Sequence, residues 1–165
     1  MHYKYNLTTT LSPQEVWDFF NSPDYRPYWV SGLLSSTRVK GKHQEKGNLL
    51  RVLFLINGTE LELREEILDI VPGEKLKLSF TSTGSSSVVT INITTDDLLT
   101  IITLQLEVQW KGVRSLLLKA FWQPSVEKRW SASMELLTKM LEAKSVLFSH
   151  GSDQNNTDQF PVYQP

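Results

Sequence analysis

The chain has 165 residues, enough for one domain with a substantial core, and its net charge of −1 provides no basic field to attract nucleic acid. Hydrophobic residues make up 40% and charged residues 21%, which is typical of a globular protein. The lack of cysteine excludes disulfides, thiolate nucleophiles and cysteine-ligated metal. The first residues do not resemble a signal peptide and no apolar run is long enough for stable membrane insertion, so we expect a cytoplasmic location.

The start of the chain predicts one strand followed by two short helices. Alternating apolar and polar residues over 2–9 indicate a half-buried strand. Ser12 and Glu15 then form the pattern of a capping box, with a proline between them at the first helical position. A second helical turn ends near Tyr28, so the two helices are expected within 13–28.

The region 33–110 predicts six further strands in an antiparallel meander. Its clearest turn is Asn57-Gly58, because both central positions of a two-residue hairpin turn need a positive φ. Further turns are expected at Pro72-Gly73, around Gly84 and at Asp96-Asp97. Such short connections exclude parallel neighbours, which need a crossover of a dozen residues or more. With the first strand, the sheet has seven strands.

Alternation within these strands predicts one inward face. The inward side chains are Val52, Phe54, Ile56, Leu61, Leu63, Ile67, Leu76, Leu78, Phe80, Val89, Ile91, Ile93, Ile102, Leu104, Leu106, Val108 and Trp110. Glu65 shares their parity, so its carboxylate points inward at a high cost unless it is paired; the alternative is a β-bulge or the mouth of a cavity. Leu53, Leu55 and Leu99 point outward, either as a dimer contact or as scattered surface leucines.

Helical periodicity after Gly112 predicts a long C-terminal helix over 113–148 that covers the apolar face of the sheet. Its apolar stripe runs through Val126, Trp130, Met134 or Ser133, Leu137 and Leu141, with Glu127, Lys128, Arg129 and Lys139 off the stripe. Pro124 predicts a kink, or a short helix 113–122 followed by the main helix. The domain then covers 1–148, and residues 149–165 form a polar tail.

Several short motifs follow one another along the chain. They are the helix opening at 11–18, the segment 23–29, Gly47 before a strand, the spacing from Ile67 to Leu76 around Pro72, and the closing helix at 121–143. In this order they resemble the START-like, or SRPBCC, superfamily, and most closely its bacterial polyketide cyclase/dehydrase-like group. The resemblance covers residues 2–148. It implies an α+β helix-grip fold, in which the seven-stranded antiparallel sheet wraps round the C-terminal helix above a hydrophobic cavity.

A ligand in such a cavity would contact apolar and aromatic side chains with a few polar tips. The expected lining is Tyr3, Tyr5, Tyr28, Trp29, Phe54, Leu63, Glu65, Phe80, Ile91, Leu104, Leu106, Trp110, Trp122, Val126, Trp130, Met134 and Leu137. The three histidines are expected at the surface, and no cluster has metal-ligand spacing, so neither a metal nor another cofactor is expected. Glu65 is the candidate general base.

Three hypotheses about function follow, because the superfamily's members range from lipid carriers and hormone receptors to aromatic-ring cyclases. The sequence favours a non-catalytic carrier or sensor of a small hydrophobic ligand, such as a lipid, a polyketide or another apolar or aromatic metabolite. The second hypothesis is a cyclase or dehydrase in which Glu65 is the general base and a tyrosine orients a carbonyl. The third is an interaction module with a filled core, which forms a homodimer through Leu53 and Leu55.

Overall fold

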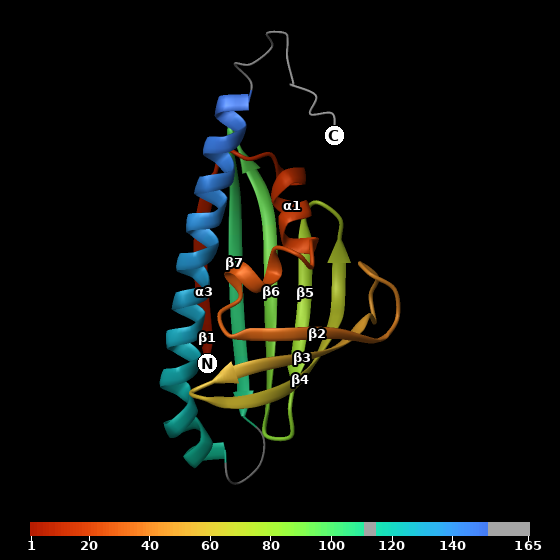
Figure 1. Cartoon of the computed structure of the whole chain (residues 1–165), viewed down its shortest axis with the longest axis vertical. Coiled ribbons are helices and arrows are strands. Elements are labelled where there is room, and N and C mark those ends of the chain that lie inside the picture. Colours follow the sequence, from red (N-terminus) through yellow and green to blue (C-terminus); the bar gives the residue numbers. More distant parts are fainter. Residues whose placement is uncertain (111–114, 152–165) are drawn as a thin grey trace, which may run out of the picture.

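The computed structural model describes the backbone of residues 1–110 and 115–151 and the side chains of 1–110 and 123–146. Within these ranges, one antiparallel sheet of seven strands packs against one long helix, with two short helices between the first two strands (Figure 1). The strands are β1 (His2–Thr9), β2 (Leu33–Lys40), β3 (Leu49–Ile56), β4 (Thr59–Val71), β5 (Lys75–Thr81), β6 (Ser85–Asp96) and β7 (Leu99–Trp110). The helices are α1 (Pro13–Asn21), α2 (Arg26–Trp29) and α3 (Ser115–Gly151). This architecture confirms the predicted helix-grip fold.

The strand order β1-β7-β6-β5-β4-β3-β2 is the predicted meander, with β1 added at the β7 edge. The β3–β4 hairpin turns at Asn57 and Gly58, whose φ angles of 50° and 77° are both positive, as a tight hairpin turn requires. A register shift between Ile67 and Asp69 breaks the pairing of β4 with β5 and bends β4. Bends of this kind let β2, β3 and β4 curve across one end of the sheet (Figure 1).

The predicted capping box opens α1. The Ser12 hydroxyl accepts the backbone N–H of Glu15 at 3.3 Å, and the Glu15 carboxylate accepts the backbone N–H of Ser12 at 2.8 Å. These two bonds satisfy donors that a helix start otherwise leaves unpaired. The helix buries one side against the sheet through Val16, Trp17, Phe19 and Phe20. The cap therefore stabilises the N-terminal end of the helix whose apolar side packs in the core.

α3 continues through Pro124, so the predicted alternative of a separate helix 113–122 is wrong. Pro124 is exposed, and water can therefore satisfy the carbonyl group that its missing N–H leaves without a partner. The helix ends at Gly151, three residues beyond the predicted domain end at 148. The remainder of the predicted polar tail lies outside the described residues. No helix in the described ranges is both long and apolar enough to cross a membrane.

The core forms two clusters on the inner face of the sheet. The larger cluster joins α1 and the strands β4 to β7 to Met134, Leu137 and Leu141 of α3, which confirms the C-terminal half of the predicted stripe. The smaller cluster is centred on Val52, Phe54 and Ile56 of β3. All inward side chains of the predicted set are buried or half-buried. A space remains between the two clusters, and it is the candidate site.

Candidate ligand-binding site

A cavity of about 890 Å³ lies between the inner face of the sheet and the helices α2 and α3. α3 packs against β1, β7 and α2, and the cavity lies beside these contacts over the inner face of β3, β4 and β5. Its apolar wall includes Trp29, Val30, Leu33, Leu50, Phe54, Leu61, Leu63, Leu76, Leu78, Phe80, Val89, Ile91, Leu104, Leu106, Val126 and Trp130. The volume falls within the range of roughly 300–1,000 Å³ that small-molecule sites occupy.

A buried ion pair stands in this apolar wall. Arg26 of α2 donates two hydrogen bonds to Glu65 of β4, one of them from Nη1 to Oε1 at 2.8 Å and the other from Nη2 to Oε2. The Glu65 side chain is 3% exposed and the Arg26 side chain 15%, so the pair is largely withdrawn from water. A bidentate guanidinium–carboxylate contact of this kind satisfies both groups where water cannot. The inward carboxylate of Glu65 is therefore paired.

The alternative positions expected for Glu65 are not those of the structure. Glu65 pairs with Leu50 on one side and Phe80 on the other in regular register, and the nearest bulge lies beyond it, between Ile67 and Asp69. A side chain 3% exposed is also not at an open mouth. The sequence did not identify Arg26 as its partner, because a helix of four residues has no periodicity that could orient an arginine.

Arg129 of α3 is a second cation at the cavity wall. Its Nη2 donates to the Ser31 carbonyl at 2.7 Å, and its guanidinium carbon lies 4.7 Å from the centroid of the Phe54 ring. Its Nε is buried without an acceptor, and burial lowers the pKa of this guanidinium. One turn along the helix, the Ser133 hydroxyl accepts the Ser31 N–H at 2.9 Å. Arg129 and Ser133 thus hold the segment between α2 and β2 against α3.

The sequence prediction placed Arg129 off the apolar stripe, and the structure corrects this. Arg129 follows Val126 by three residues and precedes Ser133 by four, which is the spacing of one helix face. The side chains of this face line the cavity, while Met134, Leu137 and Leu141 pack in the larger core cluster. The spacing of Val126, Arg129 and Ser133 was therefore the sequence signal that could have indicated a second, partly polar face of the helix.

Two further polar atoms in the lining have no hydrogen-bond partner. They are the indole N–H of Trp29 and the side-chain carbonyl oxygen of Asn48, and both are buried. The Trp29 ring packs edge-to-face on Phe20, with the ring centroids 5.4 Å apart. An unpartnered buried polar atom costs about 1–3 kcal/mol, so a ligand that satisfies one gains in affinity.

The cavity brings together most of the predicted lining. The predicted residues that line it are Trp29, Phe54, Leu63, Glu65, Phe80, Ile91, Leu104, Leu106, Val126 and Trp130. These residues come from β3, β4, β5, β6, β7, α2 and α3 and share the inward parity or the helix face already described. The lining residues that the prediction did not include are apolar in part, such as Val30, Leu33 and Leu50, and polar in part. The buried or half-buried polar ones on which the site depends are Arg26, Arg129, Asn48 and Ser133.

Other predicted lining residues lie elsewhere. Tyr3, Tyr5 and Met134 line a separate groove between β1 and α3, because strand parity does not reveal where along the sheet the helix lies. Leu137 is fully buried in the core, and Trp110 is half-buried outside both the cavity and the groove.

Two further aromatic residues, Tyr28 and Trp122, were predicted to line the cavity. Tyr28 is 66% exposed, since the short helix α2 turns Arg26 and Trp29 inward instead. The prediction for the Trp122 side chain lies outside the described residues.

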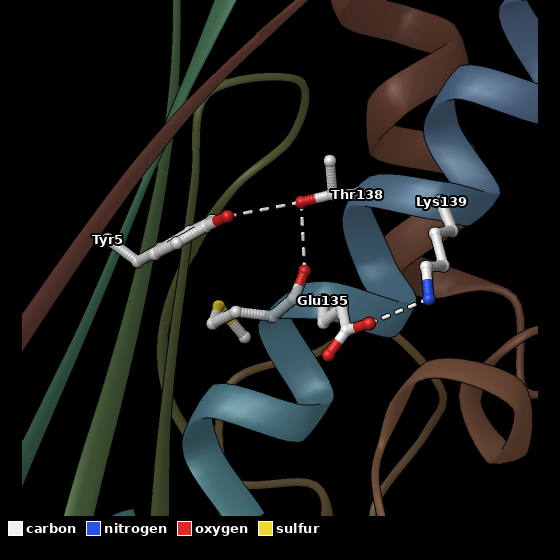
Figure 2. Close-up of polar contacts among 5 residues, drawn as sticks. Tyr5, Glu135, Thr138 and Lys139 are labelled. Carbon is white, nitrogen blue, oxygen red and sulfur yellow. Dashed lines mark hydrogen bonds and ion pairs between the residues drawn. The ribbon is translucent and has the colours of Figure 1, made fainter.

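The two N-terminal tyrosines use their hydroxyl groups to fix α3 on β1. Thr138 donates to the Met134 carbonyl at 2.9 Å, so the Tyr5 hydroxyl is the donor in its 3.2 Å contact with Thr138 (Figure 2). Tyr3 donates to Glu127 at 3.0 Å, and burial together with that carboxylate raises the pKa of Tyr3 to about 12. These polar tips are therefore engaged in the fold and are not directed at a ligand.

The described residues contain no group of three histidine, aspartate or glutamate side chains placed to hold a metal ion. The ionisable side chains that line the cavity are Arg26, Arg38, His43, Glu65 and Arg129. Of these, Arg38 and His43 are exposed. The chemistry that this lining can perform is therefore the burial of an apolar body with polar recognition at a few points.

Comparison with known proteins agrees with this geometry. A search of curated proteins by sequence finds no match. Among solved structures, a protein from Thermus thermophilus aligns with a TM-score of 0.68 at 12% identity, over 88% of this chain and 99% of that chain. A START superfamily protein from Mycobacterium smegmatis aligns with a TM-score of 0.64 at 13% identity, over 89% and 98%. The major latex-like protein 151 of Panax ginseng gives 0.59 at 11%, over 83% and 94%.

At these identities the structural similarity shows the fold alone, which is the helix-grip fold of START-like proteins. The sequence itself matches a family model over residues 4–142, nearly the whole described chain. The chain therefore belongs to the polyketide cyclase / dehydrase and lipid transport family, within the SRPBCC superfamily.

Proposed function

We propose that the protein binds one small hydrophobic ligand in the cavity between the sheet and α3 and acts as its carrier or sensor. The observation that carries the proposal is a cavity of about 890 Å³ with a predominantly apolar wall. Moving apolar ligand surface from water into such a wall is favourable by about 25 cal/mol per Å². The family description, which includes lipid transport, supports the same class of ligand.

The enzymatic alternative is a cyclase or dehydrase with Glu65 as general base, and the ion pair weighs against it. Both carboxylate oxygens of Glu65 accept hydrogen bonds from Arg26. A base must come within hydrogen-bond reach of the proton that it removes, and here the guanidinium group occupies that position. The tyrosines that could orient a carbonyl are also directed elsewhere, because Tyr3 and Tyr5 contact α3.

The third alternative is an interaction module with a filled core. The volume of the cavity weighs against a filled core. Leu55 is 45% exposed on the outer face of β3 and Leu53 is half-buried there, so these two leucines by themselves offer little apolar surface for a stable dimer. Ligand binding is the proposal that the volume and the apolar wall of the cavity favour.

The test is a variant that fills the cavity without changing the sheet. Leu63 lines the cavity from β4, and Leu63→Trp places a larger ring in that space. We expect binding of Nile red, a neutral apolar dye, to weaken by about tenfold or more in a fluorescence titration. Val71→Trp is the control, because Val71 is an exposed residue near the end of the same strand.

Thermal unfolding of both variants establishes that they remain folded. Undiminished Nile red binding by folded Leu63→Trp would contradict the proposed site. Loss of binding in both variants would place the dye on the surface of β4 and would also contradict it.

A further inference from the structure

We propose that the ligand of this cavity carries a carboxylate at one end of its apolar body and that this carboxylate docks on Arg129. The inference rests on the proposed function and specifies its ligand. It starts from the charges in the lining, which comprise three arginines and one glutamate among the described residues. The lining is therefore positive, although the chain as a whole has a net charge of −1.

Arg129 is the cation in this set that is half-buried without a counter-ion. Glu65 neutralises Arg26, and Arg38 is exposed to water. Among the described side chains, no carboxylate lies within ion-pair distance of Arg129. A half-buried cation without an anion is costly, because a medium of low dielectric constant disfavours isolated charge. An anion brought by the ligand supplies what the protein lacks.

The hydrogen bonds of Arg129 point to the same chemistry. A guanidinium group has five N–H donors, and the described structure gives it one acceptor, the Ser31 carbonyl. Its Nε is buried without a partner, as is the indole N–H of Trp29, two residues before Ser31. Both of these unpartnered groups are donors, and a ligand group that accepts hydrogen bonds would satisfy them. A carboxylate accepts at both oxygens and matches the planar guanidinium.

The place of Arg129 along the cavity keeps the carboxylate away from the negative charge of Glu65. Arg129 lies over the ring of Phe54, whereas Glu65 pairs with Leu50, four residues earlier on β3. Four strand residues span about 13 Å. The ligand head group would therefore lie near the Phe54 end, and its apolar body would extend along the wall towards Phe80, which pairs with Glu65.

The experiment compares three ligands that share one apolar chain, namely dodecanoate, dodecanol and dodecylamine, as competitors of Nile red. We expect the wild-type protein to bind dodecanoate about tenfold more tightly than dodecanol, and dodecylamine least, because a charge-assisted hydrogen bond contributes about this much. In Arg129→Met, dodecanoate should lose this advantage while dodecanol keeps its affinity. Arg129→Lys retains the charge and should keep part of the preference.

Lys128→Gln is the matched control. Lys128 is the exposed neighbour of Arg129 on α3 and does not line the cavity, so its loss removes the same charge outside the site. The preference for dodecanoate should survive in this variant. Loss of the preference in Lys128→Gln as well would show a general effect of charge and would overturn the role of Arg129.

The outcomes separate this inference from the proposed function. Binding of all three ligands with equal affinity by the wild-type protein would overturn the carboxylate inference and leave the proposed function standing. Equal weakening of dodecanoate and dodecanol in Arg129→Met would assign Arg129 to holding Ser31 and would also overturn it. Failure of the wild-type protein to bind either Nile red or any of the three ligands would contradict the proposed function itself.

Discussion

Arg26 on α2 and Glu65 on β4 lie 39 residues apart in the sequence and form a bidentate ion pair in the wall of an apolar cavity. The pair fastens α2, the shortest helix of the described chain, to β4. Because Trp29 belongs to the same helical turn, the ion pair also fixes one aromatic residue of the cavity wall.

Removal of one partner of this pair should destabilise the protein more than removal of both. Arg26→Met leaves the Glu65 carboxylate buried without a counter-ion, which costs about 3–5 kcal/mol. The double variant Arg26→Met with Glu65→Leu leaves no unpaired charge and should recover most of this loss. Urea unfolding of Arg26→Met, Glu65→Leu and the double variant measures the coupling. Additive losses would show that the pair contributes no interaction energy.

Replacement of Glu15 should give a stability change that depends on pH. Hydrogen bonds from Ser12 hold the pKa of Glu15 below its ordinary value of 4.5. Its charged form therefore stabilises the fold fully above the pKa of the unfolded chain, and this contribution is lost as the pH falls through the lower folded pKa. Glu15→Gln should reduce the free energy of unfolding by about 0.3–1 kcal/mol at neutral pH, because glutamine can still accept the Ser12 N–H but lacks the charge. The difference from the wild type should vanish in acid, and a constant difference would contradict the assigned contact.

Two glycines with nearly equal φ angles should differ in their tolerance of alanine. Gly32 and Gly58 have φ angles of 76° and 77°, and a side chain at either pays the cost of a left-handed conformation, about 1 kcal/mol. A Cβ at Gly32 would also lie 2.7 Å from the Leu55 carbonyl oxygen, while Gly58 faces open space. Gly32→Ala should therefore lose about 1 kcal/mol more of its free energy of unfolding than Gly58→Ala, and thermal unfolding measures the difference. Equal losses would contradict the close approach at Gly32.

A charge on the outer face of β3 should leave ligand binding intact. Leu55 is exposed on the face opposite Phe54, which lines the cavity. Leu55→Glu should therefore bind Nile red as the wild-type protein does, and light scattering of the same samples measures the oligomeric state. Weaker binding together with a lower mass would show that the site depends on contact between copies of the chain.

The fold was predictable because its signals are local. The positive φ angles at Asn57 and Gly58 and the capping box at Ser12 and Glu15 depend on a few adjacent residues, and each appears in the structure as expected. Alternation in the strands then assigned the inner face, including Glu65, because period two leaves little freedom once a turn fixes the register.

The polar part of the site was less predictable because its contacts are long-range. Nothing in the four residues of α2 indicates that Arg26 reaches Glu65, and nothing near Arg129 indicates that its partner is the Ser31 carbonyl. The exclusion of Tyr3 and Tyr5 from the cavity likewise depends on where α3 lies across β1, which strand patterning does not encode.

We propose that the cavity holds one small apolar ligand, and native mass spectrometry of the protein purified from its own host can detect that ligand. We expect a single added mass per chain that is lost under denaturing conditions and can be extracted as an apolar compound. Ligand binding in the cavity would be contradicted by a mass equal to that of the bare chain that stays unchanged when dodecanoate, dodecanol or Nile red is added.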